Sequence, residues 1–370
     1  MRVAIDSGAW AITKRLVLII ALICASVAGA TADTWDDLVA AAKLEGRVVV
    51  IGPPDPQVRV ELPAAFKKRF GVTVDYLGGR TNEQVAKLRA ERGSGLYTTD
   101  VVVAGIGTIA TSLYPEKMLA PIKPVLVLPE VLDGSKWKRG ALWFGDPEEQ
   151  YVLRLSNAVQ PSFYINTNGA KPSDFKSGRD LFDAKWKGKI GVQDPTTLGS
   201  GATFAARIFT AFGEDGLKAL YIDQKPAITR DARQLTDWLL RGTYPIVMSA
   251  DQDEVERMRA EGMPIQSIYG LPGLPASVSA EFGMLALFDK APHPNAAKVF
   301  INWIASREGM EVWARARNEA PTRNDIDELS FLGESKIPKA GVDYLDTYDW
   351  DFTVNVREKV RLRMKEMLGR

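Results

Sequence analysis

The sequence predicts an α/β protein made of two α/β domains, with a two-strand hinge and a ligand cleft between them. A chain of 370 residues with 46% hydrophobic and 25% charged content favours two globular domains over one. Short apolar strands alternate with helical segments, which is typical of parallel sheets. Two further apolar segments, at residues 162–166 and 282–287, border the second set of elements and are expected to cross between the domains.

In the first set, strands are predicted at residues 47–51, 72–76 and 100–104, with helices at 63–70 and 81–92 between them. The strands are short apolar runs, the first helix carries apolar residues four positions apart, and the second helix starts with a capping-box pattern. Because the strands should run parallel, the loops that follow them should meet at the carboxyl edge of one sheet, where open α/β folds bind ligands.

In the second set, strands are predicted at residues 189–192 and 244–249, with helices at 202–212, 234–241 and 253–261. The last of these helices ends before a glycine, a common helix terminator. The same alternation of strands and helices therefore predicts a second α/β domain.

Two apolar helical segments near the end of the chain, at residues 295–304 and 307–316, are expected to pack back on the first domain. We therefore predict a first domain of residues 33–161 and 284–320, and a second domain of residues 162–283 and 321–370.

The N-terminal residues 1–32 are typical of a secretory signal peptide. Lys14 and Arg15 precede an uncharged run at residues 16–28, which is shorter than the roughly 20 residues that a membrane-spanning helix needs. Small residues then provide a cleavage site after Ala30 or Ala32. We therefore expect a secreted protein.

Composition excludes several classes of function. The net charge of +1 gives no field for binding nucleic acid. The single cysteine, Cys24, lies inside the signal peptide behind Ile23, which is too large for lipoprotein processing, so the mature chain has no thiol for disulfides or zinc. With His293 as its sole histidine, the chain offers no base for Ser-His catalysis, and we expect no enzyme activity and no cofactor.

Several segments resemble type 2 periplasmic binding proteins of ABC transporters, specifically the ferric-iron-binding group. They are KWKGKIG at 185–191, the Ser200-Gly201-Ala202 turn, Gly242 ahead of the strand through Ser249, FINWIASREG at 300–309 and APTRND at 320–325. The resemblance covers nearly all of the mature chain. It implies a monomeric periplasmic protein that closes its hinge around a small-molecule solute and delivers it to an inner-membrane permease.

The sequence departs from the ferric-binding pattern at the metal ligands. Ferric-binding members carry two adjacent tyrosines where this chain has Asp251-Gln252. The family's histidine in the first loop falls near Asp55, and its carboxylate after the third strand falls near Gly105. The comparison with the resembled family therefore implies that the side chains that bind iron are missing from this chain, and we expect no bound metal.

A cluster of hydroxyl-bearing and small residues forms a candidate binding site for an anionic group of the solute. A predicted helix N-terminus is surrounded by Thr196, Thr197, Ser200, Gly201 and Ala202. The unpaired N–H groups and the dipole at such a helix start attract an anion. In the resembled family this turn holds a phosphate or carbonate beside the metal. The alternative is an ordinary N-cap that satisfies its own helix.

From the opposite domain, Arg80 offers a guanidinium for a carboxylate or phosphate, unless it is a solvated surface charge. Asp251 is a candidate for binding an amine or hydroxyl, or else an acid in the first turn of its helix. The full set of candidate ligand-binding residues is Asp55, Arg80, Thr81, Gly105, Thr108, Thr197, Ser200, Gly201, Ala202, Ser249, Asp251 and Gln252.

The preferred hypothesis is capture of a small organic solute that carries a carboxylate or phosphate group. Three alternatives stay open. They are ferric iron, a polyamine-like cation read by Asp251 and Asp55, and an enzyme that uses Asp251 or Glu281 as an acid-base group.

Overall fold

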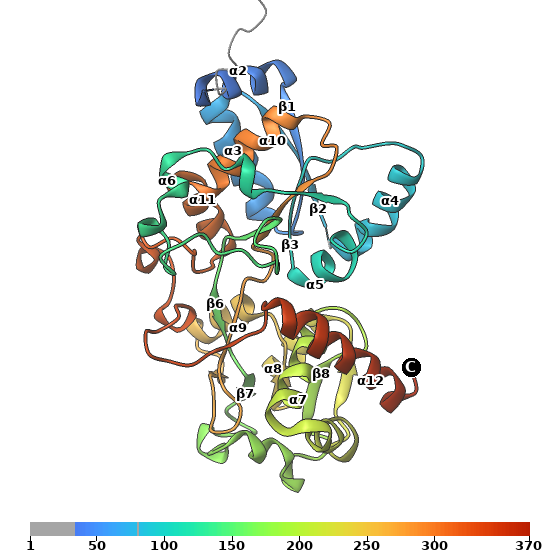
Figure 1. Ribbon diagram of the computed structural model, residues 1–370. Coiled ribbons are helices and arrows are strands. Elements are labelled where there is room, and N and C mark those ends of the chain that lie inside the picture. Colours follow the sequence, from blue (N-terminus) through green and yellow to red (C-terminus); the bar gives the residue numbers. More distant parts are fainter. Residues whose placement is uncertain (1–33, 80) are drawn as a thin grey trace, which may run out of the picture.

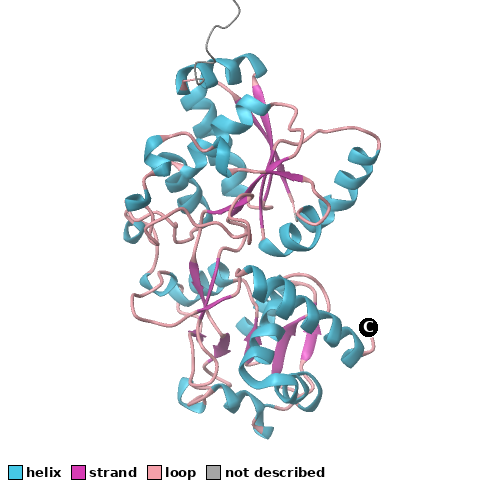
Figure 2. Cartoon of the chain, viewed as in Figure 1, coloured by secondary structure: helices cyan, strands magenta, loops and turns pink. Residues whose placement is uncertain are grey.

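The computed structural model describes residues 34–79 and 81–370. The predicted signal peptide, Cys24 and Arg80 lie outside the described residues. Figure 1 shows two α/β units, one above the other, with several chain passages between them. Each unit contains a sheet of its own, drawn in magenta in Figure 2. The predicted fold class is confirmed. In the part of the chain that the structure describes, no helix is both long and apolar enough to cross a membrane.

The first unit is built around a mixed sheet with the strand order β2-β1-β3-β13-β4, in which β5 also pairs with β13. Its strands are β1 (Arg47–Gly52), β2 (Thr73–Gly78), β3 (Val101–Ala104), β4 (Leu119–Ala120), β5 (Val152–Arg154) and β13 (Met284–Phe288). The first three strands run parallel, as predicted, and β13 joins β3 antiparallel. The carboxyl ends of β1 and β3 therefore point toward the second unit.

Helices cover this sheet and supply its core. They are α2 (Trp35–Glu45), α3 (Pro56–Phe70), α4 (Thr81–Gly93), α5 (Ile106–Thr108), α6 (Pro129–Leu132), α10 (Pro294–Ala305) and α11 (Arg307–Arg317). Phe66 of α3 packs on Phe300 and Trp303 of α10, with ring centroids 5.2 and 5.3 Å away. Aromatic packing thus explains the predicted return of α10 to this unit, and α11 joins the same core through Met310 and Trp313.

Helix α3 begins seven residues earlier than its apolar spacing predicted. Asp55 caps its N-terminus by accepting hydrogen bonds from the N–H groups of Gln57 and Val58 at 2.8 and 3.1 Å. Pro56, which the sequence suggested was part of a loop, occupies the first helical position, where a missing N–H costs nothing. This earlier start places Asp55 at the edge of the sheet.

The second unit has the strand order β11-β7-β10-β8-β9. Its strands are β7 (Phe163–Asn166), β8 (Ile190–Gln193), β9 (Ala227–Thr229), β10 (Ile246–Met248) and β11 (Ile265–Ile268), and its helices are α7 (Ser200–Lys218), α8 (Ala232–Arg241), α9 (Gln252–Ala260) and α12 (Glu358–Leu368). Strands β8, β9 and β10 run parallel, and β7 is antiparallel to β10. The starts of α7 and α9 thereby lie at the edge of the sheet that faces the first unit.

Three short strands cross between the units and pair with one another. They are β6 (Ala158–Gln160), β12 (Ser277–Ser279) and β14 (Leu345–Asp346), in the order β14-β12-β6. The expected crossings at residues 162–166 and 282–287 are instead β7 and β13, strands inside the two sheets. Both are fully buried, and continuous burial marks the interior of a sheet, whereas the true crossing strands just before them are short and partly polar.

The C-terminal segment contacts both units. Ile326 still belongs to the first core, so the last passage lies beyond the expected boundary at residue 320. Further on, Trp350 packs edge-to-face on Tyr114 of the first unit, with ring centroids 5.0 Å apart, while Phe352 lies in the second core. A π-helix, η10 (Phe352–Arg357), then leads into α12. We call residues 345–357 the C-terminal strap.

Candidate functional site

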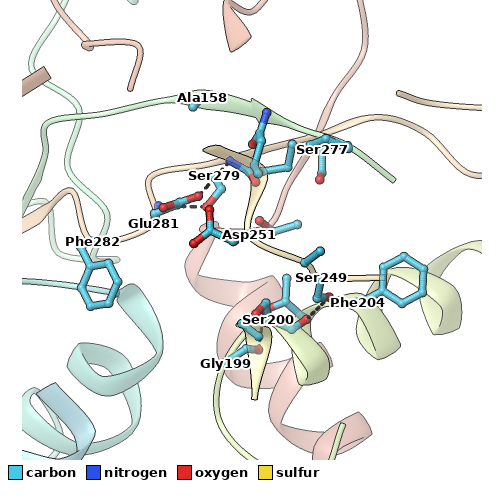
Figure 3. A pocket seen from close by; sticks show the side chains of 18 of the residues that line it. Ala158, Gly199, Ser200, Phe204, Ser249, Asp251, Ser277, Ser279, Glu281 and Phe282 are labelled. Carbon is cyan, nitrogen blue, oxygen red and sulfur yellow. Dashed lines mark hydrogen bonds between the residues drawn. The ribbon is translucent and has the colours of Figure 1, made fainter. Parts of the chain in front are cut away.

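A cleft of about 750 Å³ opens between the two units, and residues of both units, the crossing strands and the C-terminal strap line it. Figure 3 shows Asp251 and Glu281 directed toward one part of this cleft and Ser200 and Ser249 toward another. The structure brings eight of the twelve predicted site residues to its wall. They are Asp55, Thr81, Gly105, Thr108, Ser200, Ser249, Asp251 and Gln252.

The other predicted residues have different places. Thr197 donates from its hydroxyl to the carbonyl of Asp194 at 3.3 Å, and Ala202 is fully buried. Gly201 lies against the Asp194 backbone, where a Cβ atom would meet the carbonyl oxygen at 2.4 Å. These three residues build the turn before α7 and are not among those that line the cleft. Arg80 lies outside the described residues, so its role stays a prediction.

The N-terminus of α7 opens on the cleft without a side-chain cap. Its N-cap residue, Gly199, has no side chain and adopts φ 137°. The Ser200 hydroxyl donates to the side-chain oxygen of Gln193, and the Ser249 hydroxyl donates to the Ser200 carbonyl at 3.3 Å. The first-turn N–H groups are therefore not engaged by a capping side chain, which is the arrangement that favours an anion.

Arg357 of the C-terminal strap brings a buried guanidinium to the same region. The residue is 5% exposed, and its Nη1 lies 3.5 Å from the Thr203 hydroxyl of α7. Its Nη2 atom has no hydrogen-bond partner among the described residues. The neighbouring Glu358 pairs with Arg361 instead. Burial lowers the pKa of Arg357, but a guanidinium stays protonated in proteins, so the residue adds a positive charge to the lining of the cleft.

A glycine in the first unit makes room for this guanidinium. A Cβ atom on Gly107 would lie 2.5 Å from Nη2 of Arg357. Gly107 lies in α5, a three-residue helical turn within the loop after β3 that sequence reasoning placed at the carboxyl edge of the sheet. Arg357 therefore lies between α7 of the second unit and this loop of the first.

A second buried arginine, Arg207 of α7, lines the cleft and joins the crossing segments. It is 5% exposed and donates to the carbonyls of Pro161 and Pro275 at 3.3 and 3.1 Å and to the Ser162 hydroxyl at 2.9 Å. Its Nε has no partner among the described residues. Burial lowers the pKa of Arg207 to about 10, so it is still charged at neutral pH. The signal missed in the sequence was a lone arginine within the apolar stripe of a predicted helix.

A third arginine, Arg317, is surrounded by carboxylates. It pairs with Asp55 at 2.9 Å, Glu281 at 2.8 Å and Glu319 at 2.7 Å. Burial raises the pKa of Glu319 to about 7, against the opposing charge of Arg317. One guanidinium thus faces three carboxylates, and the group keeps a negative charge.

Asp251 lies at the start of α9 and also borders the cleft, so its role in binding a solute stays a prediction. It caps α9 by accepting from the N–H of Glu254 at 3.1 Å, and it lines the cleft. Asp251 and Glu281 line the cleft together with Tyr164, whose pKa is raised first by burial and then by the charges of Tyr269, Glu281 and Asp251. Within residues 34–79 and 81–370, no group of three or more His, Cys, Asp or Glu side chains is placed to hold a metal ion.

Comparison of the sequence with known protein families identifies a match that covers most of the chain. Residues 61–337 match the family of bacterial extracellular solute-binding proteins. The chain belongs to this family. A curated relative of this solute-binding protein, an uncharacterized protein of Haemophilus influenzae, is 23% identical over 321 residues, which span 79% of this chain and 85% of the relative.

Solved structures show the same fold. The solute-binding protein is similar to iron-bound HitA from Pseudomonas aeruginosa, with a TM-score of 0.66 at 16% identity over 86% of this chain and 99% of HitA. AfuA from Actinobacillus pleuropneumoniae, with fructose-6-phosphate bound, gives a TM-score of 0.65 at 17% identity over 88% and 99% of the two chains. Trichodesmium IdiA, in complex with iron and citrate, gives 0.64 at 15% identity over 88% and 99%. The predicted type 2 periplasmic binding fold is confirmed.

Proposed function

We propose that this solute-binding protein captures a small organic anion in the periplasm, as a monomer, for delivery to an ABC permease. Its family is one of binding proteins that serve uptake transporters. The anionic character of the solute is our inference from the cleft. The protein's role is then to bind the solute, with no chemical conversion.

One observation carries this proposal, namely the buried guanidinium of Arg357, which pairs with no carboxylate in the part of the chain that the structure describes. Removing a charge from water is costly unless an opposite charge or hydrogen bonds compensate it. The Nη2 atom has no partner among the described residues, and the uncapped first turn of α7 lies beside it. A carboxylate or phosphate placed there would accept from the guanidinium and from the helix N–H groups together.

The position of the anion also supports capture by closure. Gly107 and Thr108 belong to the first unit, Ser200 and Thr203 to the second, and Arg357 to the strap that contacts both. An anion held by these groups contacts both units at once. It therefore stabilises the closed arrangement more than the open one, which is the condition for ligand-driven closure.

The direct test is to identify the solute and then weaken its anchor. Mass spectrometry of the ligand released from freshly purified protein should find a small molecule with a carboxylate or phosphate group, returned unchanged after incubation. Arg357→Gln should weaken its binding in calorimetric titration by about 10- to 150-fold, equivalent to roughly 1.5–3 kcal/mol for a hydrogen bond to a charged group.

Arg363→Gln is the matched control, because Arg363 lies on α12, the helix that follows Arg357, and pairs with Glu214 at the surface. Its affinity should equal that of the wild type. A native solute without an anionic group, or equal affinities of the wild type and Arg357→Gln, would overturn the proposal.

Ferric iron is the second candidate, because HitA and IdiA were solved with iron. Titration of the wild type with ferric citrate tests it. We expect no stoichiometric uptake of iron, because Asp251 and Gln252 stand where the ferric-binding group carries its tyrosine pair, and because Arg317 already engages Asp55, Glu281 and Glu319. A visible iron-phenolate absorption band would contradict this expectation.

A further inference from the structure

The wall of the cleft near Arg317 carries more negative than positive charge. Asp253 pairs with Lys336, and Glu254 pairs with Arg257, so these two carboxylates are balanced. The group around Arg317 is not, since three carboxylates share one guanidinium. Asp251 forms none of the ion pairs found in the described part of the chain and adds a further charge.

One oxygen of this acidic wall has no hydrogen bond. Glu319 is 4% exposed, and its Oε2 atom has no partner among the described residues. The Ser156 hydroxyl accepts a hydrogen bond from Nε1 of Trp313 at 3.1 Å, and its nearness to Glu319 lowers the pKa of that carboxyl against the effect of burial. A buried acceptor without a donor costs free energy, so a donor from a ligand would be favourable here.

Tyr348 of the C-terminal strap lines the cleft together with Glu281 and Arg357. Its hydroxyl donates to the backbone carbonyl of Glu281. Burial, followed by the negative charge of Glu281, raises the pKa of Tyr348, and the positive charge of Arg357 opposes that shift. Glu281, Tyr348 and Arg357 all line the same cleft of about 750 Å³, so both charged parts border the space that one small molecule would occupy.

We propose that the solute is a zwitterion, with its anionic group held by Arg357 and the first turn of α7, and an ammonium group held by Asp251, Glu281 and Glu319. This inference rests on the proposed function and adds the second charge of the solute. An ammonium group supplies three N–H donors and one positive charge. Hydroxyl groups, such as those of a sugar, also donate hydrogen bonds, but they leave the excess of negative charge uncompensated.

The test uses probes that differ in the amine alone. Phosphoethanolamine and ethyl phosphate form one pair, and β-alanine and propionate form the other. In calorimetric titrations at pH 7.5, the amine-bearing member of at least one pair should bind about tenfold more tightly than its partner, the smallest effect expected of a charged hydrogen bond. Fructose 6-phosphate serves as the hydroxyl-rich comparison and should bind more weakly than phosphoethanolamine.

The variant Asp251→Asn tests whether the carboxylate of Asp251 helps to bind the ammonium group. Asparagine is as good an N-cap as aspartate, so α9 should keep its start while losing the negative charge. The variant should lose most of the difference between the paired probes and keep the affinity for ethyl phosphate or propionate. Asp231→Asn is the matched control, because Asp231 caps α8 in the same way and is not among the residues that line the cleft.

The outcomes separate the two proposals. Equal binding of the paired probes, or tighter binding of fructose 6-phosphate, would overturn the zwitterion and leave an anionic solute in place. An unchanged difference in Asp251→Asn and Glu281→Gln would also overturn it. Failure of every probe to bind would overturn the proposed function itself.

Discussion

At the scale of the residue, Glu319 links the charge of the cleft to the stability of the fold. Its pKa rises from an ordinary value of 4.5 to about 7, first because it is buried and despite the attraction of Arg317. At a pH between these two pKa values, Glu319 holds a proton in the native protein, whereas in the unfolded chain it has already released that proton. The free energy of unfolding therefore falls as the pH rises through this window, by an amount on the order of 1–3 kcal/mol, and the loss is complete above pH 7.

We predict that Glu319→Gln removes this dependence. The free energy of unfolding of the variant, relative to the wild type, should rise between pH 5 and pH 8 in urea denaturation curves measured at both values. Glu308→Gln changes an exposed glutamate of α11 and controls for surface charge. A relative stability that is flat, or that falls, over this interval would contradict the burial of a titrating Glu319.

The same residues show how far sequence reasoning reaches. Asp55 and Gly105 were predicted because they follow strands of the first set and match ligand positions of the resembled family, and Ser200 because it lies at a predicted helix N-terminus; all three line the cleft. Arg317 and Arg357 were missed, since each reaches the cleft from a segment outside the strand-helix alternation. Their distances to Glu281 or Thr203 depend on how remote segments pack, and no local pattern encodes that.

At the scale of the element, the turn before α7 depends on a glycine. A Cβ atom on Gly201 would lie 2.4 Å from the Asp194 carbonyl oxygen and 2.7 Å from that of Gln193. These are backbone atoms, so relief requires the helix start to move. Because α7 presents its first turn to the cleft, the shift would affect stability and binding together.

We predict that Gly201→Ala lowers the free energy of unfolding by about 1–3 kcal/mol, the usual cost of overpacking a tight contact, and weakens solute binding. Gly93→Ala is the control, because a Cβ atom there meets nothing within 4 Å. Denaturation curves of the two variants should therefore differ. Equal stability would show that the turn can relax without cost.

The elements also explain why the crossings were misplaced. Strands β7 and β13 are fully buried and largely apolar. Because of this apolar character, the sequence predicted that these two segments cross between the domains. The crossing strands β6 and β12 have three residues each, too few for a clear pattern. The strand β14 has two, so a third crossing left no signal that could be read in the sequence.

At the scale of the whole molecule, export is the first requirement, since the family is extracellular. We predict that the mature protein begins at about Thr31 or Asp33, after the small residues that follow the apolar run. N-terminal sequencing of protein exported by a native-like host measures this directly. Periplasmic material that retains Met1 would contradict the signal peptide.

Closure of the two units is the motion that the whole fold permits. Three short paired strands connect the units, and a polar contact joins the end of α11 to α9 across the cleft, in which Asn318 donates to Asp253 at 2.9 Å. Lys336 binds the same carboxylate. Hinges of this kind bend at a few residues while each core stays intact.

We predict that saturating solute reduces the radius of gyration in small-angle X-ray scattering, because an anion at Arg357 contacts both units. Arg357→Gln should show a smaller reduction at the same solute concentration, since less of it is bound. The variant Asp253→Asn should bind the solute with an affinity within a few-fold of the wild type. It changes the contact between α11 and α9 across the cleft but leaves Arg357 in place. A radius of gyration that does not change when the wild type is saturated would rule out closure as the means of capture, even if the solute proves to be an anion.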